Sequence, residues 1–80
     1  MGSAMQVTPD VTEGATILRV VGTNEAWLEN YRTLLEYTEE NIRVAGKHIE
    51  VCITGSRMRI EHYGSVDMKI TGTIEKIEFV

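Results

Sequence analysis

The side chains that could form a metal or catalytic site in this sequence are the set His48, Glu50, Cys52 and His62, which combines both histidines and the single cysteine with one carboxylate. Zinc takes imidazole, thiolate and carboxylate ligands, and it needs three or four of them converging in space. The chain holds two histidines and one cysteine and has no Cys-x-x-Cys spacing, so no local motif gathers such a set. We therefore expect no metal and no cofactor, and a small-ligand or metal-binding β domain is the alternative function.

A nucleophilic pair of Cys52 and His48 is excluded by distance if both residues lie on one strand. Residues four positions apart on a strand are about 13 Å apart at ~3.3 Å per residue, whereas a general base must lie within hydrogen-bonding reach of its nucleophile. The glycines are followed by no Lys-Ser or Lys-Thr pair, so no phosphate-binding loop is present either. The sequence therefore predicts that the protein is not an enzyme and has no catalytic residues.

Two groups of charged residues have the composition to bind ions of opposite charge. Glu36, Glu39 and Glu40 with Asn41 form an acidic cluster, but the absence of an Asp-x-Asp-x-Asp-Gly loop favours a solvated turn over a cation site. Three bases of the second half would suit an acidic ligand, but the acids among them favour weak cross-strand ion pairs. The bases are Arg57, Arg59 and Lys69, and the acids are Glu50, Glu61 and Asp67.

The composition indicates which elements must position these residues. Ile and Val supply 16 of the 80 residues and Thr supplies 9, whereas Leu supplies only 4. Such β-branched residues suit a pleated sheet better than a helical bundle. The length allows one small domain, which is marginally stable alone, so self-association or a protein partner is expected.

Charge, hydropathy and cysteine content narrow the class of protein further. A net charge of −4 argues against nucleic acid as a partner. No apolar run approaches the roughly 20 residues that a membrane-spanning helix needs. The single cysteine excludes an internal disulfide framework and fits a reducing compartment.

The chain divides into three parts by composition. Residues 1–5 (MGSAM) resemble a cloning scar, residues 6–14 (QVTPDVTEG) are polar and predict an extended N-terminal arm, and residues 15–80 predict a single β domain. Within that domain, glycines recur at intervals of eight or nine residues, as expected for turns between short strands. These glycines are Gly46, Gly55, Gly64 and Gly72.

Apolar and polar residues alternate in 48–54, 57–63 and 66–71, which predicts antiparallel strands with one buried and one exposed face. The last run breaks this alternation, because Ile74 and Ile77 are three residues apart, so we expect a β-bulge or strong twist near Glu75-Lys76. The predicted fold is all-β, an antiparallel meander of about seven or eight short strands forming a twisted sheet, a sandwich or a rolled barrel.

Residues 24–41 fit two structures. Helical spacing of Trp27, Tyr31, Leu34 and Leu35 predicts an α+β fold with a helix at 24–40, and this local periodicity slightly favours the helix. The alternative has strands at 26–31, 34–37 and 42–45, with turns near residues 32–33 and 39–40. On that alternative we expect Trp27 in the core, Tyr31 or Tyr37 at an interface, and Asn30 as a buried polar residue at a turn.

Several segments occur in an order that resembles the YabP/YqfC family of sporulation proteins. Residues 8–11 and 17–22 resemble its N-terminal segment and first strand, residues 28–31 and 35–37 its apolar-Glu-Asn-aromatic and apolar-Glu-Tyr segments, and residues 41–44 its next strand. Residues 53–60 resemble its Ile-x-Gly-x-x-Leu-x-Ile element, with Met58 for Leu, and residues 70–79 its closing Ile-x-Gly-x-Ile-x-x-Ile-x-Phe. Residues 32–33 and 45–48 depart from the pattern. The residues that carry the resemblance are Gly22, Glu29, Asn30, Tyr31, Glu36, Tyr37, Gly55, Ile60, Gly72, Ile74 and Phe79.

The resemblance implies an all-β fold, so it favours strands over a helix at 24–40. It also implies a non-enzymatic, cytoplasmic protein of the mother cell of a sporulating bacterium, acting in spore-coat assembly or through a membrane-protein partner. For a small β domain, addition of a partner strand at an open sheet edge is the natural mode of assembly.

Overall fold

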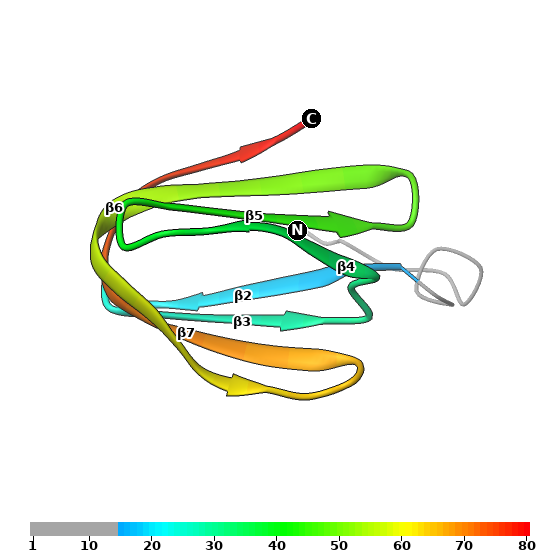
Figure 1. Ribbon diagram of the computed structural model, residues 1–80, viewed down its shortest axis with the longest axis horizontal. Helices are drawn as coiled ribbons and strands as arrows, with labels where there is room; N and C mark the ends of the chain where they lie inside the picture. The colour runs from blue at the N-terminus through cyan, green and yellow to red at the C-terminus, as the bar shows by residue number, and fades with distance from the viewer. Residues whose placement is uncertain (1–14) are drawn as a thin grey trace, which may run out of the picture.

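The computed structural model describes residues 15–80, so the cloning scar expected at 1–5 and the arm expected at 6–14 lie outside the described residues. Six strands form one antiparallel sheet with the order β2-β3-β7-β6-β5-β4 (Figure 1). Their bounds are β2 Ile17–Val21, β3 Glu25–Glu29, β4 Thr33–Tyr37, β5 Asn41–Gly46, β6 Ile49–Tyr63 and β7 Asp67–Phe79. The all-β fold is confirmed. The helix at 24–40 was wrong, because partners elsewhere in the sheet pair with these residues as strands.

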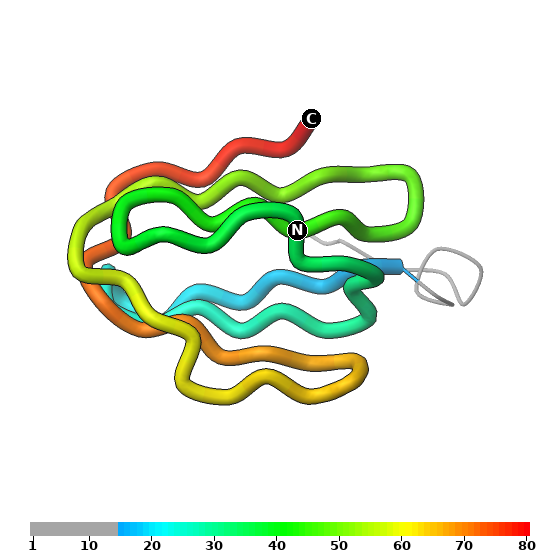
Figure 2. The backbone as a smooth tube through the Cα atoms, viewed as in Figure 1, coloured from blue at the N-terminus to red at the C-terminus, as the bar shows by residue number. Residues whose placement is uncertain are grey.

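The sheet folds over into two layers, one containing β2 and β3 and the other containing β4 and β5. Its two longest strands, β6 and β7, each bend and run through both layers (Figure 2). The first half of β6 pairs with β5, whereas the first half of β7 pairs with β3. A flat sheet would separate β3 from β4 by four strand spacings, about 19 Å, whereas the short link from Glu29 to Thr33 spans at most about 14 Å. The chain therefore requires a rolled sheet rather than a flat one.

The predicted strand count and the simple meander need correction. Gly55 and Gly72 were expected in turns, but they lie inside β6 and β7, so four expected short strands merge into two long ones. The order is also not a plain meander, because β3 pairs with β7 instead of β4. Gly46 and Gly64 do lie beside the two chain reversals that flank β6.

The core lies between the two layers and draws on β3, β5, β6 and β7. Its buried apolar residues are Ala26, Leu28, Tyr31, Ile42, Val44, Val51, Ile53, Met58, Met68, Ile70 and Ile74. The expected bulge is confirmed, because Thr54 pairs with Lys76 while Gly55 pairs with Ile74, which leaves Glu75 as the extra residue. This extra residue lets both Ile74 and Ile77 contact the core.

Trp27 was expected in the core and Tyr31 or Tyr37 at an interface, but it is Tyr31 that lies in the core. Trp27 is only half-buried on the outer face of β3, with the Arg19 guanidinium 5.7 Å and the Lys69 ammonium 5.2 Å from its ring centroid. Tyr31 is 7% exposed, stacks on Tyr63 and donates its phenol proton to the Gly64 carbonyl. A residue buried in this way offers little surface to a partner.

Asn30 lies at a turn as expected, but it is exposed rather than buried. Its φ of 62° is left-handed, a conformation that Asn adopts more readily than most residues. Its side chain donates to the Ala15 carbonyl, and its backbone nitrogen donates to the Val66 carbonyl. Asn30 therefore links the segment just before β2 to the β6–β7 turn, through its side chain on one side and its backbone nitrogen on the other.

Candidate functional site

Among residues 15–80, β2 pairs only with β3, so its other edge is the first surface able to bind a partner. Leu18 and Val20 lie opposite Leu28 and Ala26 and so face the core, whereas Ile17 and Val21 lie on the outer face. Three of these four side chains are substantially exposed, since Ile17, Val20 and Val21 have exposed fractions of 41%, 41% and 52%. We call residues 17–21 the β2 edge.

The second surface lies where the end of β4 meets the bend of β6. Tyr37 is half-exposed, and its phenol oxygen accepts a hydrogen bond from the Ile60 backbone nitrogen at 3.0 Å. The β4–β5 loop lies against the same bend, because the Glu39 and Glu40 carbonyls accept hydrogen bonds from the backbone of Met58 and Gly55. These contacts surround a polar pocket of about 350 Å³. Its lining residues, hereafter the arginine pocket, are Tyr37, Glu39, Arg57, Met58 and Arg59.

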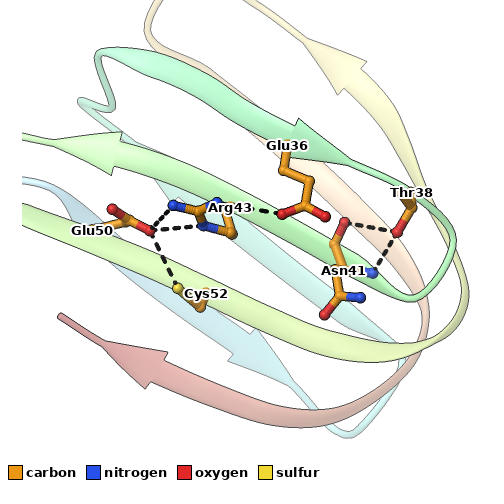
Figure 3. Close-up of polar contacts among 6 residues, drawn as sticks. All are labelled: Glu36, Thr38, Asn41, Arg43, Glu50 and Cys52. Atoms are coloured by element: carbon orange, nitrogen blue, oxygen red, sulfur yellow. Dashed lines mark hydrogen bonds and ion pairs between the residues drawn. The ribbon is translucent and has the colours of Figure 1, made fainter.

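A polar network covers the outer face of β4, β5 and β6 (Figure 3). Arg43 forms ion pairs with Glu50 at 2.8 Å and with Glu36 at 3.4 Å, while the Cys52 thiol donates to Glu50 at 3.5 Å. The hydrogen bond and charge of Glu50 raise the pKa of the Arg43 guanidinium above its ordinary value. Burial, and then the hydrogen bond to Glu50, raise the pKa of the Cys52 thiol. A thiol with a raised pKa is a poor nucleophile at neutral pH, because the thiolate is the reactive form.

The four residues first considered for metal binding do not gather. His48 occupies the β5–β6 turn with a φ of 65°, whereas His62 lies beyond the bend of β6 and contacts Asp67 at 3.3 Å. Within residues 15–80, no group of three or more His, Cys, Asp or Glu side chains is placed to hold a metal ion. Glu50 and Cys52 instead belong to the network around Arg43.

The acidic cluster forms a turn that the protein stabilises with its own groups. The Thr38 hydroxyl accepts a hydrogen bond from the backbone nitrogen of Asn41 at 2.8 Å (Figure 3). It also accepts one from the backbone nitrogen of Glu40 at 3.2 Å. Glu36 points to Arg43, whereas Glu39 lines the arginine pocket. The cluster is thus divided between two surfaces.

The residues that carry the family resemblance are spread over the fold. Tyr31, Gly55 and Ile74 are buried, and Ile60 packs against the core, whereas Phe79 is 58% exposed near the end of β7. The others occupy the β2–β3 turn, the end of β3, the β3–β4 link, β4 and the bend of β7, and these are Gly22, Glu29, Asn30, Glu36, Tyr37 and Gly72. Only Tyr37 lines the arginine pocket, so most of these residues shape the fold instead of a shared site.

Sequence reasoning missed two features of these surfaces. It treated residues 17–21 as an ordinary strand, although four apolar residues out of five would have suited either a buried or an edge strand. It also predicted cross-strand ion pairs for Arg57, Arg59 and Lys69. Lys69 does contact Glu61 at 3.6 Å, but among residues 15–80 neither arginine has an ion-pair partner.

Comparison with known proteins gave a family and one relative. The model of the YabP family matches residues 12–80. A Bacillus subtilis (strain 168) protein named Uncharacterized protein YqfC is 27% identical over 77 residues, which cover 96% of this chain and 83% of the relative. No solved structure matches the chain. Within residues 15–80, the structure has no helix long and apolar enough to cross a membrane.

Proposed function

Because this chain belongs to the YabP family, we propose that it is a non-enzymatic β-sheet module that assembles with other proteins during spore formation. It acts in the mother cell, either in coat assembly or through a membrane-protein partner, as the resemblance to the YabP/YqfC sporulation proteins implies. The proposal includes self-association of the chain through the surface that binds its partners.

The observation that supports assembly most directly is the β2 edge. A strand with one free side carries unpaired backbone N–H and C=O groups, which form hydrogen bonds with an added strand. Proteins that avoid such pairing usually place Lys, Pro or inward-pointing charges on an edge. The β2 edge has Arg19 as its only charge, and that guanidinium lies over the Trp27 ring. Apolar residues on both faces then give an incoming strand hydrophobic contacts as well.

Lysine substitutions on the outer face of β2 test the proposal. Ile17→Lys and Val21→Lys add charge to the edge without entering the core, so a circular-dichroism spectrum should be unchanged. Light scattering after size exclusion, together with a pull-down from sporulating cells, should show an oligomer or a partner for the unmodified chain and its loss in both variants. Val66→Lys is the matched control, because Val66 is 57% exposed in the β6–β7 turn and lies outside β2.

The same variants, placed in the host chromosome, connect the edge to spore formation. Deletion of the gene should lower the count of heat-resistant spores, and Ile17→Lys or Val21→Lys should lower it in the same direction. A normal spore count after deletion would contradict the sporulation role. A stable monomer that recovers no partner would contradict the assembly role.

A further inference from the structure

The arginine pocket presents hydrogen-bond donors that lack acceptors within the described residues. The Tyr37 phenol oxygen accepts from Ile60, but its own proton has no acceptor among residues 15–80. Arg57 and Arg59 are exposed and have no ion-pair partner in the same part of the chain. Guanidinium and phenol groups donate to acceptor-only ligands, of which a carboxylate is the commonest in proteins.

A shortage of acids does not explain these unpaired arginines. The chain has 12 acids and 8 bases, and Arg43 alone contacts both Glu36 and Glu50. Glu39 is the one acid that lines the pocket, yet its carboxylate forms no ion pair with either arginine. Arg57 and Arg59 therefore line one open volume, and neither has an ion-pair partner among residues 15–80.

The backbone of β6 is distorted where it presents these side chains. Arg57 and Met58 together oppose the single residue Gly72, since Ser56 pairs with Thr73 and Arg59 pairs with Thr71. Arg57 has a φ of 54°, a left-handed conformation that costs roughly 1–2 kcal/mol for a residue with a Cβ. Bulges of this kind redirect side chains, and strained residues concentrate at binding sites. Here the bulge buries Met58 while leaving Arg57 and Arg59 exposed on either side of it.

We propose that the arginine pocket binds a carboxylate side chain from an acidic, extended segment of a partner protein. This inference rests on the proposed assembly function and adds the chemistry of one partner surface. Beyond Ile60, no strand within residues 15–80 pairs with the side of β6 opposite β7, so an extended segment has an edge to follow after its carboxylate binds. Phosphate would also accept hydrogen bonds from guanidinium groups, so inorganic phosphate is one arm of the test below.

Binding should be weak, because the net charge of −4 opposes the approach of an acidic segment. A dissociation constant on the order of 1 mM corresponds to about −4 kcal/mol. Nuclear magnetic resonance of the ¹⁵N-labelled full chain suits this range. The probe is acetylated penta-glutamate amide, and penta-glutamine amide is its uncharged control. The Arg57 and Arg59 side-chain N–H signals and the Ile60 amide should shift with penta-glutamate only.

Four substitutions make the test specific. Arg57→Gln and Arg59→Gln should each weaken the binding of penta-glutamate by about two- to fivefold, the range expected for exposed charge pairs. Arg32→Gln, an equal change of charge at the opposite end of β4, should leave binding unchanged. Glu39→Gln should strengthen binding, again by about two- to fivefold, because it removes the repelling carboxylate. A purely structural role for the arginines would not produce this opposite sign at Glu39.

Several results would overturn the inference. These are shifts that persist when both arginines are replaced, an effect of Arg32→Gln equal to that of the pocket variants, or shifts caused by inorganic phosphate but not by penta-glutamate. The β2-edge variants separate this inference from the function on which it rests. If Ile17→Lys and Val21→Lys abolish assembly while penta-glutamate does not bind, only the carboxylate inference fails.

Discussion

Gly72 of β7 lies directly against the backbone of Arg57 in β6. A Cβ atom placed on Gly72 would lie 2.6 Å from the Arg57 carbonyl oxygen and 2.6 Å from Met58 Cα. Both residues have positive φ, 130° at Gly72 and 54° at Arg57. The β2–β3 turn also contacts this point, because the Gly72 nitrogen donates to the Asn24 carbonyl. The two layers and the arginine pocket thus depend on one close backbone contact.

Gly72→Ala should therefore destabilise the protein strongly, by roughly 3 kcal/mol or more, since it adds backbone strain to a steric clash with backbone atoms. Gly22→Ala is the matched control, because Gly22 has a φ of 60° but open space around its Cβ position. It should cost only about 1–2 kcal/mol, from the left-handed conformation alone. Urea denaturation of both variants measures the difference, and equal losses would contradict the close contact at Gly72.

Trp27→Ala should cost less stability than Leu28→Ala, although tryptophan is the larger side chain. Leu28 is fully buried, so its truncation should cost about 2–5 kcal/mol. Trp27 is half-buried, and its cation–π contacts with Arg19 and Lys69 are each worth about 0.5–1 kcal/mol. Thermal and urea denaturation test the order. A larger loss of stability for Trp27→Ala than for Leu28→Ala would indicate that Trp27 is a core residue.

Much of the fold follows from sequence patterns that report local burial. The alternation in 48–54 and the break at Ile74 and Ile77 predicted strand faces and a bulge, because burial on a strand has a period of two residues. Gly55 and Gly72 were wrongly predicted to lie in turns, since glycine suits a turn and a close backbone approach equally well. The roles of Trp27 and Tyr31 depend on the pairing of β3 with β7, which no local pattern encodes.

The candidate sites were predicted less completely than the fold. Tyr37 was expected at an interface, and it is half-exposed beside the arginine pocket, although no contact with a partner tests that role. Arg57 and Arg59 were read as members of a solvated face with ion pairs. Whether a carboxylate lies near an arginine depends on strand register, and the bulge at Arg57 changes that register. The sequence predicts which residues alternate along a strand, but it does not predict which acids lie near Arg57 and Arg59 in space.

Stability should fall at alkaline pH as Tyr31 ionises. Burial, followed by the nearby Tyr63 and Asp67, raises the pKa of the Tyr31 phenol above its ordinary value of 10.0. The folded state holds this proton more tightly than the unfolded state, so its contribution is fully present below pH 10 and is lost as the pH rises through the folded pKa.

Tyr31→Phe should lower stability by about 1 kcal/mol at neutral pH, because the hydrogen bond to the Gly64 carbonyl is lost. The variant should also lose less stability than the unmodified chain between pH 9 and pH 11, as measured by urea denaturation. An unchanged alkaline decline would contradict this assignment.

The reactivity of Cys52 should depend on Glu50 and Arg43 in opposite directions. Burial is the largest cause of the raised thiol pKa, Glu50 raises it further, and Arg43 lowers it. Glu50→Gln should therefore lower the pKa and speed alkylation by iodoacetamide at pH 8, since the thiolate fraction grows. Arg43→Gln should slow the reaction, whereas Glu36→Gln should change it little, because Glu36 contacts Arg43 only at 3.4 Å and has no contact with Cys52. If Glu50→Gln leaves the rate unchanged or lowers it, burial alone controls the thiol, and the hydrogen bond from Cys52 to Glu50 does not persist in solution.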